Sequence, residues 1–186
     1  MYSEEYKSLL QQNHAEKDPA KAWGRSGARN FGDRVIEFLK KRPQVLTVLD
    51  FGAGQRTLEK RVLAEFPELR WTSYDPGIPE ISEKPSGQFD LVLSSDVLEH
   101  IEPQHLESVL RWLHDRTKFY QYHLISCDPC KSTLPDGRNA HLIVEEPKWW
   151  YKKFERYGSI MYFADELIRK RTELRTYACI QIDKVP

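Results

Sequence analysis

The chain has 186 residues, which is enough for one globular domain with a sizeable core. Lys plus Arg and Asp plus Glu each number 28, so the formal net charge is zero, and no overall electrostatic attraction to nucleic acid or to a membrane surface is expected. Three cysteines are too few for a disulfide framework and favour the cytoplasm, and neither a signal peptide nor a membrane-spanning stretch is predicted.

Residues 1–42 are expected to form N-terminal helices and a lid within a single domain spanning 1–186. An apolar stripe predicts a helix over 3–15. The segment 22–32 is punctuated by glycines and predicts a loop or lid. A second helix should follow and end before Pro43.

Residues 43–186 are expected to form the core of this domain. Strands are predicted at 45–50, 69–74, 89–95 and 119–126, helices at 56–66, 103–117 and 147–157, and a closing antiparallel strand pair at 159–164 and 172–182. Strands that alternate with helices predict an α/β fold with a mainly parallel sheet. Right-handed crossovers then place the loops at the carboxyl ends of the strands on one edge, where ligands bind.

A glycine turn follows the first predicted strand, in the run Val-Leu-Asp-Phe-Gly-Ala-Gly at 48–54. Gly52 and Gly54 permit a tight turn and a close approach of backbone N–H groups to a ligand. Asp75 stands 21 residues beyond Gly54, at the end of the second predicted strand, where a carboxylate can accept hydrogen bonds from both hydroxyls of a ribose. Any one of these features alone has an ordinary structural alternative, a strand-to-helix turn or a turn residue. Their order along the chain indicates a nucleoside site.

The turn lacks the third glycine that usually brings a helix N-terminus to a pyrophosphate. Gln55-Arg56 occupies the matching place. This disfavours a dinucleotide and a nicotinamide-dependent oxidoreductase. S-adenosylmethionine carries no phosphate and does not need that approach.

Three segments resemble motifs of the class I S-adenosylmethionine-dependent methyltransferases: 48–54, Tyr74-Asp75, and the run Phe-Asp-Leu-Val-Leu-Ser-Ser-Asp-Val-Leu-Glu-His-Ile at 89–101. The resemblance implies a three-layer Rossmann-like fold whose C-terminal strand runs antiparallel. Only thirteen residues, 76–88, separate the second and third motifs. We therefore expect the sheet to lack the edge strand and helix that the family places after Asp75.

The resemblance also implies a cofactor site made by Trp23, Gly24, Asp50, Gly52, Ala53, Gly54, Asp75, Ser95 and Asp96. Asp50 and the glycine turn would lie against the methionine moiety, and Asp75 would hold the ribose. Ser95 and Asp96 would border the methyl-transfer channel. Trp23 and Gly24 would close over the cofactor.

The acceptor side is less specific, because methyl transfer mainly requires alignment and exclusion of water. The loop 134–142 should open on the cofactor edge, which makes Arg138 and Asn139 candidate substrate residues; a plain turn is the alternative. This loop resembles one in small methyltransferases of uncertain substrate, including phage-encoded ones. Trp149 is a further substrate candidate, since it could stack on a flat acceptor. His100 and His141 are the candidate general bases.

The pair Cys127 and Cys130 suggests two sharper alternatives. One is a zinc site with His123 or His141, and the other is Cys130 as the nucleophile for C5-methylation of a base. Both lack supporting sequence, and we predict no metal. The leading prediction is a methyltransferase acting on a small molecule or a nucleotide-like acceptor. A methyltransferase-like module that acts through partners is the alternative, and a nucleic-acid methyltransferase is less favoured. The sequence does not determine the oligomeric state.

Overall fold

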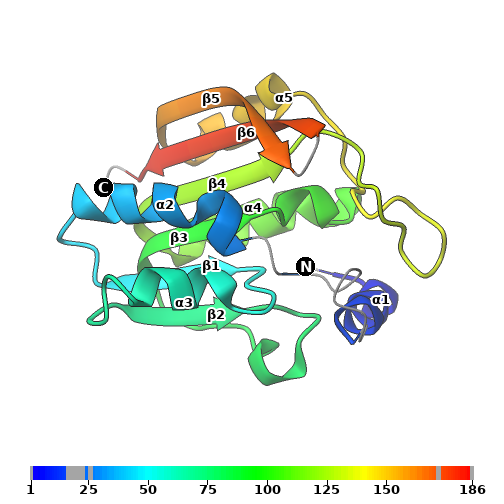
Figure 1. The fold of residues 1–186 in the computed structure, drawn as a ribbon, viewed down its shortest axis with the longest axis horizontal. Helices are drawn as coiled ribbons and strands as arrows, with labels where there is room; N and C mark the ends of the chain where they lie inside the picture. Colours follow the sequence, from blue (N-terminus) through cyan, green and yellow to red (C-terminus); the bar gives the residue numbers. More distant parts are fainter. Residues whose placement is uncertain (1, 16–23, 25–26, 171–172, 185–186) are drawn as a thin grey trace.

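The fold was analysed in a computed structural model that describes residues 2–15, 24, 27–170 and 173–184 (Figure 1). Its centre is a six-stranded sheet in the order β2-β1-β3-β4-β6-β5. The strands are β1 Thr47–Phe51, β2 Arg70–Tyr74, β3 Phe89–Ser95, β4 Thr117–Ser126, β5 Ser159–Lys170 and β6 Glu173–Asp183. Strands β1 to β4 pair in parallel, and β6 pairs antiparallel with both β4 and β5. The predicted mainly parallel sheet with an antiparallel C-terminal strand is confirmed.

The helices are α1 Glu4–His14, α2 Gly27–Lys40, α3 Thr57–Leu63, α4 Leu106–Arg116 and α5 Pro147–Phe154, with 3-10 turns η1 Pro79–Ile81, η2 Leu98–His100, η3 Pro103–His105 and η4 Glu155–Tyr157. Two apolar clusters separate them into layers. One cluster joins α2 and α3 to one face of the sheet, and the other joins α4 and α5 to the opposite face. None of the helices in the described ranges is long and apolar enough to cross a bilayer.

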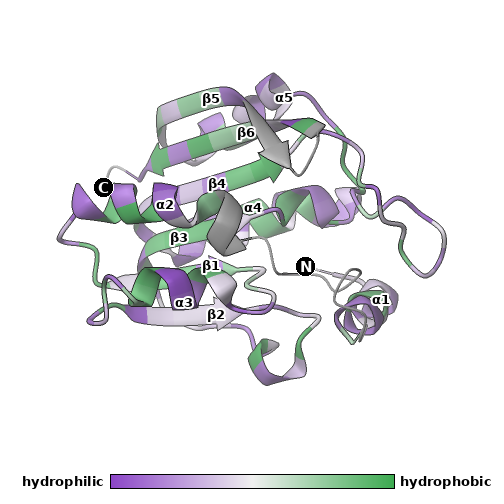
Figure 2. Cartoon of the chain, viewed as in Figure 1, coloured by the Kyte–Doolittle hydropathy of each residue, from purple (hydrophilic) through white to green (hydrophobic). Residues whose placement is uncertain are grey.

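Successive side chains along each strand point to opposite faces of the sheet, so the same strands contribute to both apolar clusters. In β1, Val48 belongs to the cluster beneath α2 and α3, whereas its neighbour Leu49 belongs to the cluster beneath α4 and α5. Both are fully buried. The hydrophobic residues therefore gather on the central strands and on the inner helix faces, as Figure 2 shows.

The segment 76–88 contains one 3-10 turn, η1, and no strand. β2 is therefore an edge strand of the sheet. The expected loss of the strand and helix after Asp75 is confirmed.

The prediction of a loop over 22–32 is wrong in its second half, because α2 begins at Gly27. Gly32 lies within this helix and faces α3. A Cβ atom at Gly32 would lie 3.0 Å from Cγ of Arg61. At Gly32 the missing side chain serves close packing of two helices, not a turn.

Candidate functional site

The glycine turn after β1 is held against the end of β2. The N–H groups of Gly52 and Ala53 donate to the carbonyl of Tyr74 at 2.8 and 3.1 Å. Gly52 has φ +77, and a Cβ atom there would lie 2.4 Å from a methyl carbon of Val97. Gly52 therefore meets two demands, a left-handed backbone and a close approach by the segment after β3.

Asp75 ties the turn to the end of β2. Its carboxylate is buried and accepts the N–H of Gly54 at 3.0 Å and the N–H of Gly77 at 2.9 Å. An ionised carboxylate has about four acceptor positions, so these two bonds leave capacity for two hydroxyl donors. Asp75 is thus both a part of the turn and a potential ligand-binding group.

Two buried polar atoms lie beside the turn at the carboxyl ends of neighbouring strands. Oδ2 of Asp50 and Oγ of Ser95 have no hydrogen-bond partner among the described residues. By alternation with Val48 and Leu93, both side chains lie on the sheet face that α2 and α3 cover. Buried polar atoms are normally paired, so a polar ligand is the expected partner of these two.

Burial, together with the nearby charges of Glu59 and Asp75, raises the pKa of Asp50 from 3.8 to about 8, and the neighbouring Trp71 indole acts in the opposite direction. Asp50 is therefore largely neutral at pH 7 in the ligand-free protein. A cation placed beside it would favour the ionised form. Asp50 is therefore suited to lie beside a positively charged group of a ligand.

We expect the stability of the ligand-free protein to fall as pH rises through the range set by Asp50. Below the unfolded-state pKa of about 4 both states hold the proton, whereas up to about 8 only the folded state keeps it, so unfolding becomes easier with rising pH. Asp50→Asn removes this loss. Its gain in free energy of unfolding over wild type should grow by about 3 kcal/mol from pH 5 to pH 8, measured by urea denaturation.

The exposed carboxylate of Asp115 provides the matched control for that experiment. Asp115→Asn should follow wild type at both pH values. A gain for Asp50→Asn that is the same at pH 5 and pH 8 would contradict the assigned neutral state.

Asp96 is fixed in place by the C-terminal strands. It has φ +57, its N–H donates to the carbonyl of Leu124 at 2.9 Å, and its Oδ1 accepts the hydroxyl of Tyr177 at 2.8 Å. Burial and the charge of Asp96 raise the pKa of Tyr177, so the phenol remains a donor. Sequence reasoning missed Tyr177, because nothing in the run 172–182 indicates this contact across the sheet.

The N-terminal segment reaches the glycine turn. Trp23 lies outside the described residues. The carbonyl of Gly24 accepts the N–H of Gln55 at 2.9 Å, and a Cβ atom on Gly54 would lie 2.4 Å from Cα of Gly24. Gly24 thus lies against the turn, and its closure over a cofactor stays a prediction.

Helix α1 lies against the same edge of the sheet, which the sequence did not indicate (Figure 1). Nε2 of His14 lies 3.7 Å from Oδ1 of Asp75. A Cβ atom on Gly77 would lie 2.5 Å from the His14 ring and 3.1 Å from Leu10. At the start of α1, the Tyr6 hydroxyl donates to the carbonyl of His100. Nothing in the sequence indicated the contact between His14 and Asp75, because a helix of 11 residues does not reveal its distant partner.

The two candidate bases come together. The rings of His100 and His141 are 4.7 Å apart and perpendicular. Nδ1 of His100 bonds the carbonyl of Ala140 at 2.7 Å, and Nδ1 of His141 bonds the carbonyl of Asp128 at 2.5 Å. Glu99, His100 and His141 form the one group of three metal-capable side chains found among the described residues.

Arg138 and Asn139 serve their own loop. Arg138 pairs with Asp136 at 2.6 Å, and both lie at the loop surface. The amide of Asn139 accepts the N–H of Cys130 at 3.0 Å and donates to its carbonyl at 2.7 Å. Neither residue lines the hollow described below, so their role as substrate residues stays a prediction.

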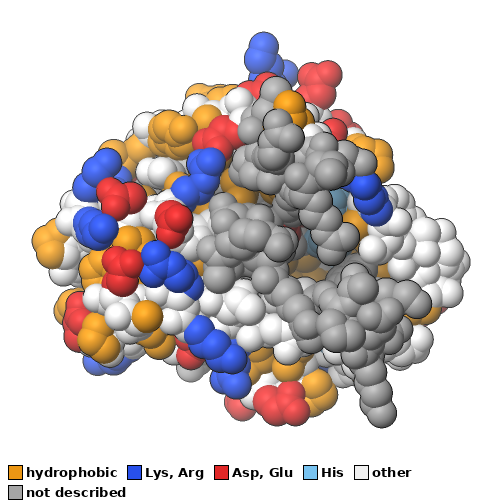
Figure 3. Space-filling model, viewed as in Figure 1, with side chains coloured by type: hydrophobic (Ala, Val, Ile, Leu, Met, Phe, Trp, Pro, Cys, Tyr) orange, Lys and Arg blue, Asp and Glu red, His pale blue; other side chains and the backbone are white. Residues whose placement is uncertain are grey.

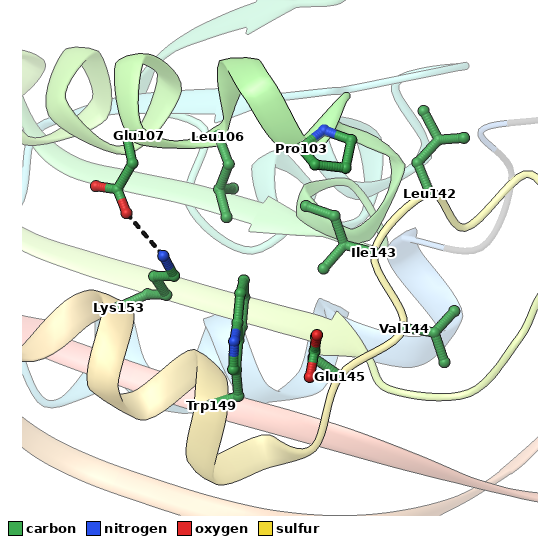
Figure 4. A pocket seen from close by; sticks show the side chains of 9 residues that line it. All are labelled: Pro103, Leu106, Glu107, Leu142, Ile143, Val144, Glu145, Trp149 and Lys153. Carbon is green, nitrogen blue, oxygen red and sulfur yellow. Dashed lines mark hydrogen bonds and ion pairs between the residues drawn. The ribbon is translucent and has the colours of Figure 1, made fainter.

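A hollow of about 310 Å³ lies between α4, α5 and the segment 142–145 (Figure 4). Its lining is formed by Pro103, Leu106, Glu107, Leu142, Ile143, Val144, Glu145, Trp149 and Lys153. Lys153 bonds Glu107 at 2.9 Å and lowers the pKa of that carboxyl. Trp149 lines the hollow, whereas its neighbour Trp150 is fully buried in the core. The volume is at the small end of the range for small-molecule sites.

The zinc alternative finds no support in the described geometry. His123 is buried between strands, stacks on Phe154 and bonds Ser94 at 2.9 Å, and burial lowers its pKa to about 3. Burial raises the pKa of the Cys127 thiol to about 12, which leaves little thiolate at that position. Cys130 is less buried than Cys127, and a nucleophilic role for it stays an alternative. Among the described residues, Cys127 and Cys130 join no group of three metal-capable side chains.

The sequence matches a family model described as "Methyltransferase domain" over residues 23–174. No curated protein matches the chain by sequence. The described fold is also similar to several solved structures of low sequence identity.

Three of these structures carry informative names. The 1,6-didemethyltoxoflavin-N1-methyltransferase of Burkholderia thailandensis, with bound S-adenosylhomocysteine, is 15% identical, with 98% of this chain and 90% of that chain covered and a TM-score of 0.70. The magnesium protoporphyrin IX methyltransferase of Synechocystis PCC 6803 is 13% identical, with 97% of both chains covered and a TM-score of 0.67. The mitomycin 7-O-methyltransferase is 14% identical, with 95% and 60% covered and a TM-score of 0.64. At these identities the likeness shows a common fold.

Proposed function

We propose that this chain, which belongs to the methyltransferase domain family, transfers a methyl group from S-adenosylmethionine to a small molecule. The observation that carries the acceptor class is the hollow beside α4 and α5, which combines an apolar lining with Trp149 and one ion pair. Such a surface suits a compact, partly aromatic compound.

The cofactor would bind at the carboxyl edge of β1, β2 and β3. Asp75 would hold the ribose hydroxyls with its remaining acceptor positions. Asp50 would lie near the positively charged groups of the methionine part, with Gly52, Ala53 and Gly54 beneath it. The unpaired Oγ of Ser95 and the buried carboxylate of Asp50 fit such a ligand, because each needs a polar partner.

S-adenosylmethionine supplies a methyl group on a sulfonium sulfur, which a nucleophile displaces directly. The protein aligns the two reactants and excludes water. Ser95 and Asp96 would border the transfer path, with Gly24 and Trp23 over the cofactor. His100 or His141 would take a proton only if the acceptor arrives protonated.

The charge distribution supports a small acceptor over a polymer. The formal net charge is zero. Where side chains are visible on the face in Figure 3, Lys and Arg groups are interspersed with Asp and Glu groups, without a broad basic surface. Long nucleic-acid substrates usually require such a basic surface. The named structures of similar fold include methyltransferases for toxoflavin, porphyrin and mitomycin compounds, which are small molecules.

The wall of the hollow is connected to the cofactor edge through the backbone. The N–H of Ile143 donates to the carbonyl of Glu99 at 2.9 Å, and Glu99 lies in η2, directly after the segment that follows β3. This bond joins the wall of the hollow to the segment that follows β3. A cytoplasmic location, expected from the cysteine content, stays a prediction.

Trp149→Ala should raise the KM for the acceptor about tenfold, equal to the loss of roughly 1–1.5 kcal/mol of aromatic stacking, and leave the affinity for S-adenosylmethionine unchanged. The measurement is S-adenosylhomocysteine release over a panel of small aromatic acceptors, followed by KM determination for the best one.

Tyr151→Ala is the matched control, because Tyr151 is an aromatic residue of the same helix, is 37% exposed and meets Phe163 edge to face outside the hollow. It should keep the wild-type KM. If both variants have wild-type KM values, the acceptor does not bind in this hollow. If no small molecule is methylated while an RNA or DNA is, the proposed acceptor class is wrong.

A further inference from the structure

We propose that Glu99, His100 and His141 bind a divalent transition-metal ion of the zinc type. One ligand atom from each of the three side chains lies within 4.8 Å of the others. Two imidazoles and one carboxylate are a set of donors that Zn²⁺ and related ions bind. This inference adds a site to the proposed function and does not depend on the identity of the acceptor.

Backbone contacts bring the three residues together from two distant segments. Glu99 and His100 form most of η2, whereas His141 lies in the loop 127–146. The carbonyl of Glu99 accepts the N–H of Ile143 at 2.9 Å, and the carbonyl of Ala140 meets His100. These contacts on both sides of His141 fix its segment against η2.

The hydrogen bonds of the two imidazoles set their tautomers. A carbonyl can only accept, so Nδ1 carries the proton in His100 and in His141. In the neutral ring, Nε2 is then the nitrogen with the lone pair that a metal requires. Histidine ligands in metal sites commonly donate their other N–H to a backbone carbonyl in this way, which fixes the ring orientation.

Glu99 supplies a carboxylate at a buried position, where an ionised group is energetically unfavourable without compensating partners. It is fully buried, and its Oε1 accepts the N–H of Ser126 at 2.9 Å, which orients the group. A carboxylate has two oxygens, so this bond and a metal ligand are compatible. A buried carboxylate needs hydrogen bonds and a nearby positive charge, and a divalent cation provides that charge.

The proposed site is accessible to solvent, and its three protein ligands do not fill the coordination shell of a metal ion. His100 and His141 are half-buried, so an ion can reach them. Three protein ligands leave coordination positions for water or another ligand, as catalytic zinc sites do. If both imidazoles ligate a metal, neither acts as the general base, and the assignment of that role to His100 and His141 is replaced.

The test is calorimetric titration of zinc chloride into untagged protein that has been stripped of metal with a chelator, without cofactor or acceptor. Wild type should bind one Zn²⁺ per chain. Glu99→Gln, which keeps an acceptor for Ser126, and His141→Gln should each weaken binding by about tenfold or more. Thermal denaturation of the metal-free variants checks that they fold, and added Zn²⁺ should raise the Tm of wild type more than that of either variant.

Two further variants locate the site. His105→Gln removes a histidine five residues beyond His100, and Cys130→Ser removes a thiol in the same loop as His141. Both should bind Zn²⁺ as wild type does. The proposal is overturned if wild type binds no Zn²⁺, if Glu99→Gln and His141→Gln bind it normally, or if Cys130→Ser abolishes binding. Cofactor affinity is measured separately, so failure of the metal site is distinguishable from failure of the proposed function.

Discussion

Asp75→Ala should weaken the binding of S-adenosylmethionine by about 3 kcal/mol or more. Two hydrogen bonds from ribose hydroxyls to a carboxylate contribute about 1.5–3 kcal/mol each. The variant also leaves the N–H groups of Gly54 and Gly77 without their buried acceptor, so the turn that meets the cofactor loosens. Calorimetry on wild type and variant measures the change directly.

Asp90→Ala is the matched control for this experiment, because Asp90 has a similar setting at the amino ends of the parallel strands. Asp90 is also buried, and its Oδ2 accepts the N–H groups of Leu46 and Thr47, each at 2.9 Å. It lies at the amino end of β3, away from the proposed cofactor edge. Asp90→Ala should lower the Tm yet keep the cofactor affinity of wild type. Equal losses of affinity in both variants would mean that Asp75 acts only through stability.

Gly52→Ala should lower the free energy of unfolding by about 2–5 kcal/mol. A side chain in the left-handed region costs about 1–2 kcal/mol, and overpacking costs about 1–3 kcal/mol more. The overpacking arises because the new Cβ would lie 2.4 and 2.5 Å from the two methyl carbons of Val97. Urea denaturation gives the value.

Gly137 separates the two contributions. It has φ +87, and a Cβ atom there would meet nothing within 4 Å, so Gly137→Ala should cost only the backbone part, about 1–2 kcal/mol. Adding Val97→Ala to Gly52→Ala removes the methyl groups in the way and should recover part of the loss, measured against Val97→Ala alone. If Gly52→Ala and Gly137→Ala are equally destabilised, Val97 does not restrict the turn.

Local patterns in the sequence predicted the frame of the molecule well. The strand expected at 89–95 matches β3 Phe89–Ser95. A parallel strand that is buried on both faces has a nearly continuous apolar sequence, which can be recognised without knowledge of its partners. The missing edge strand followed from chain length, since 76–88 is too short to form a crossover helix and a strand. The glycines at 22–32 led to a wrong loop prediction, because Gly32 serves helix packing. It lies in α2 against Arg61.

Contacts between distant segments were not predictable in the same way. His14 meets Asp75, and Tyr177 meets Asp96, through tertiary packing that no local period encodes. In the sequence, Glu99 stood out only as part of the motif at 89–101. Its closeness to His141 arises because the loop 127–146 packs against η2. The proposed cofactor residues could be chosen from the sequence because they follow consecutive strands, whereas the proposed metal and acceptor sites join segments far apart in the sequence.

The central claim is that S-adenosylmethionine binds at the carboxyl edge of β1, β2 and β3. Calorimetric titration of the cofactor tests it most directly, with S-adenosylhomocysteine and NAD titrated under the same conditions. We predict one site per chain for both sulfur compounds and no heat of binding for NAD. No binding of either sulfur compound, or tighter binding of NAD, would contradict the claim.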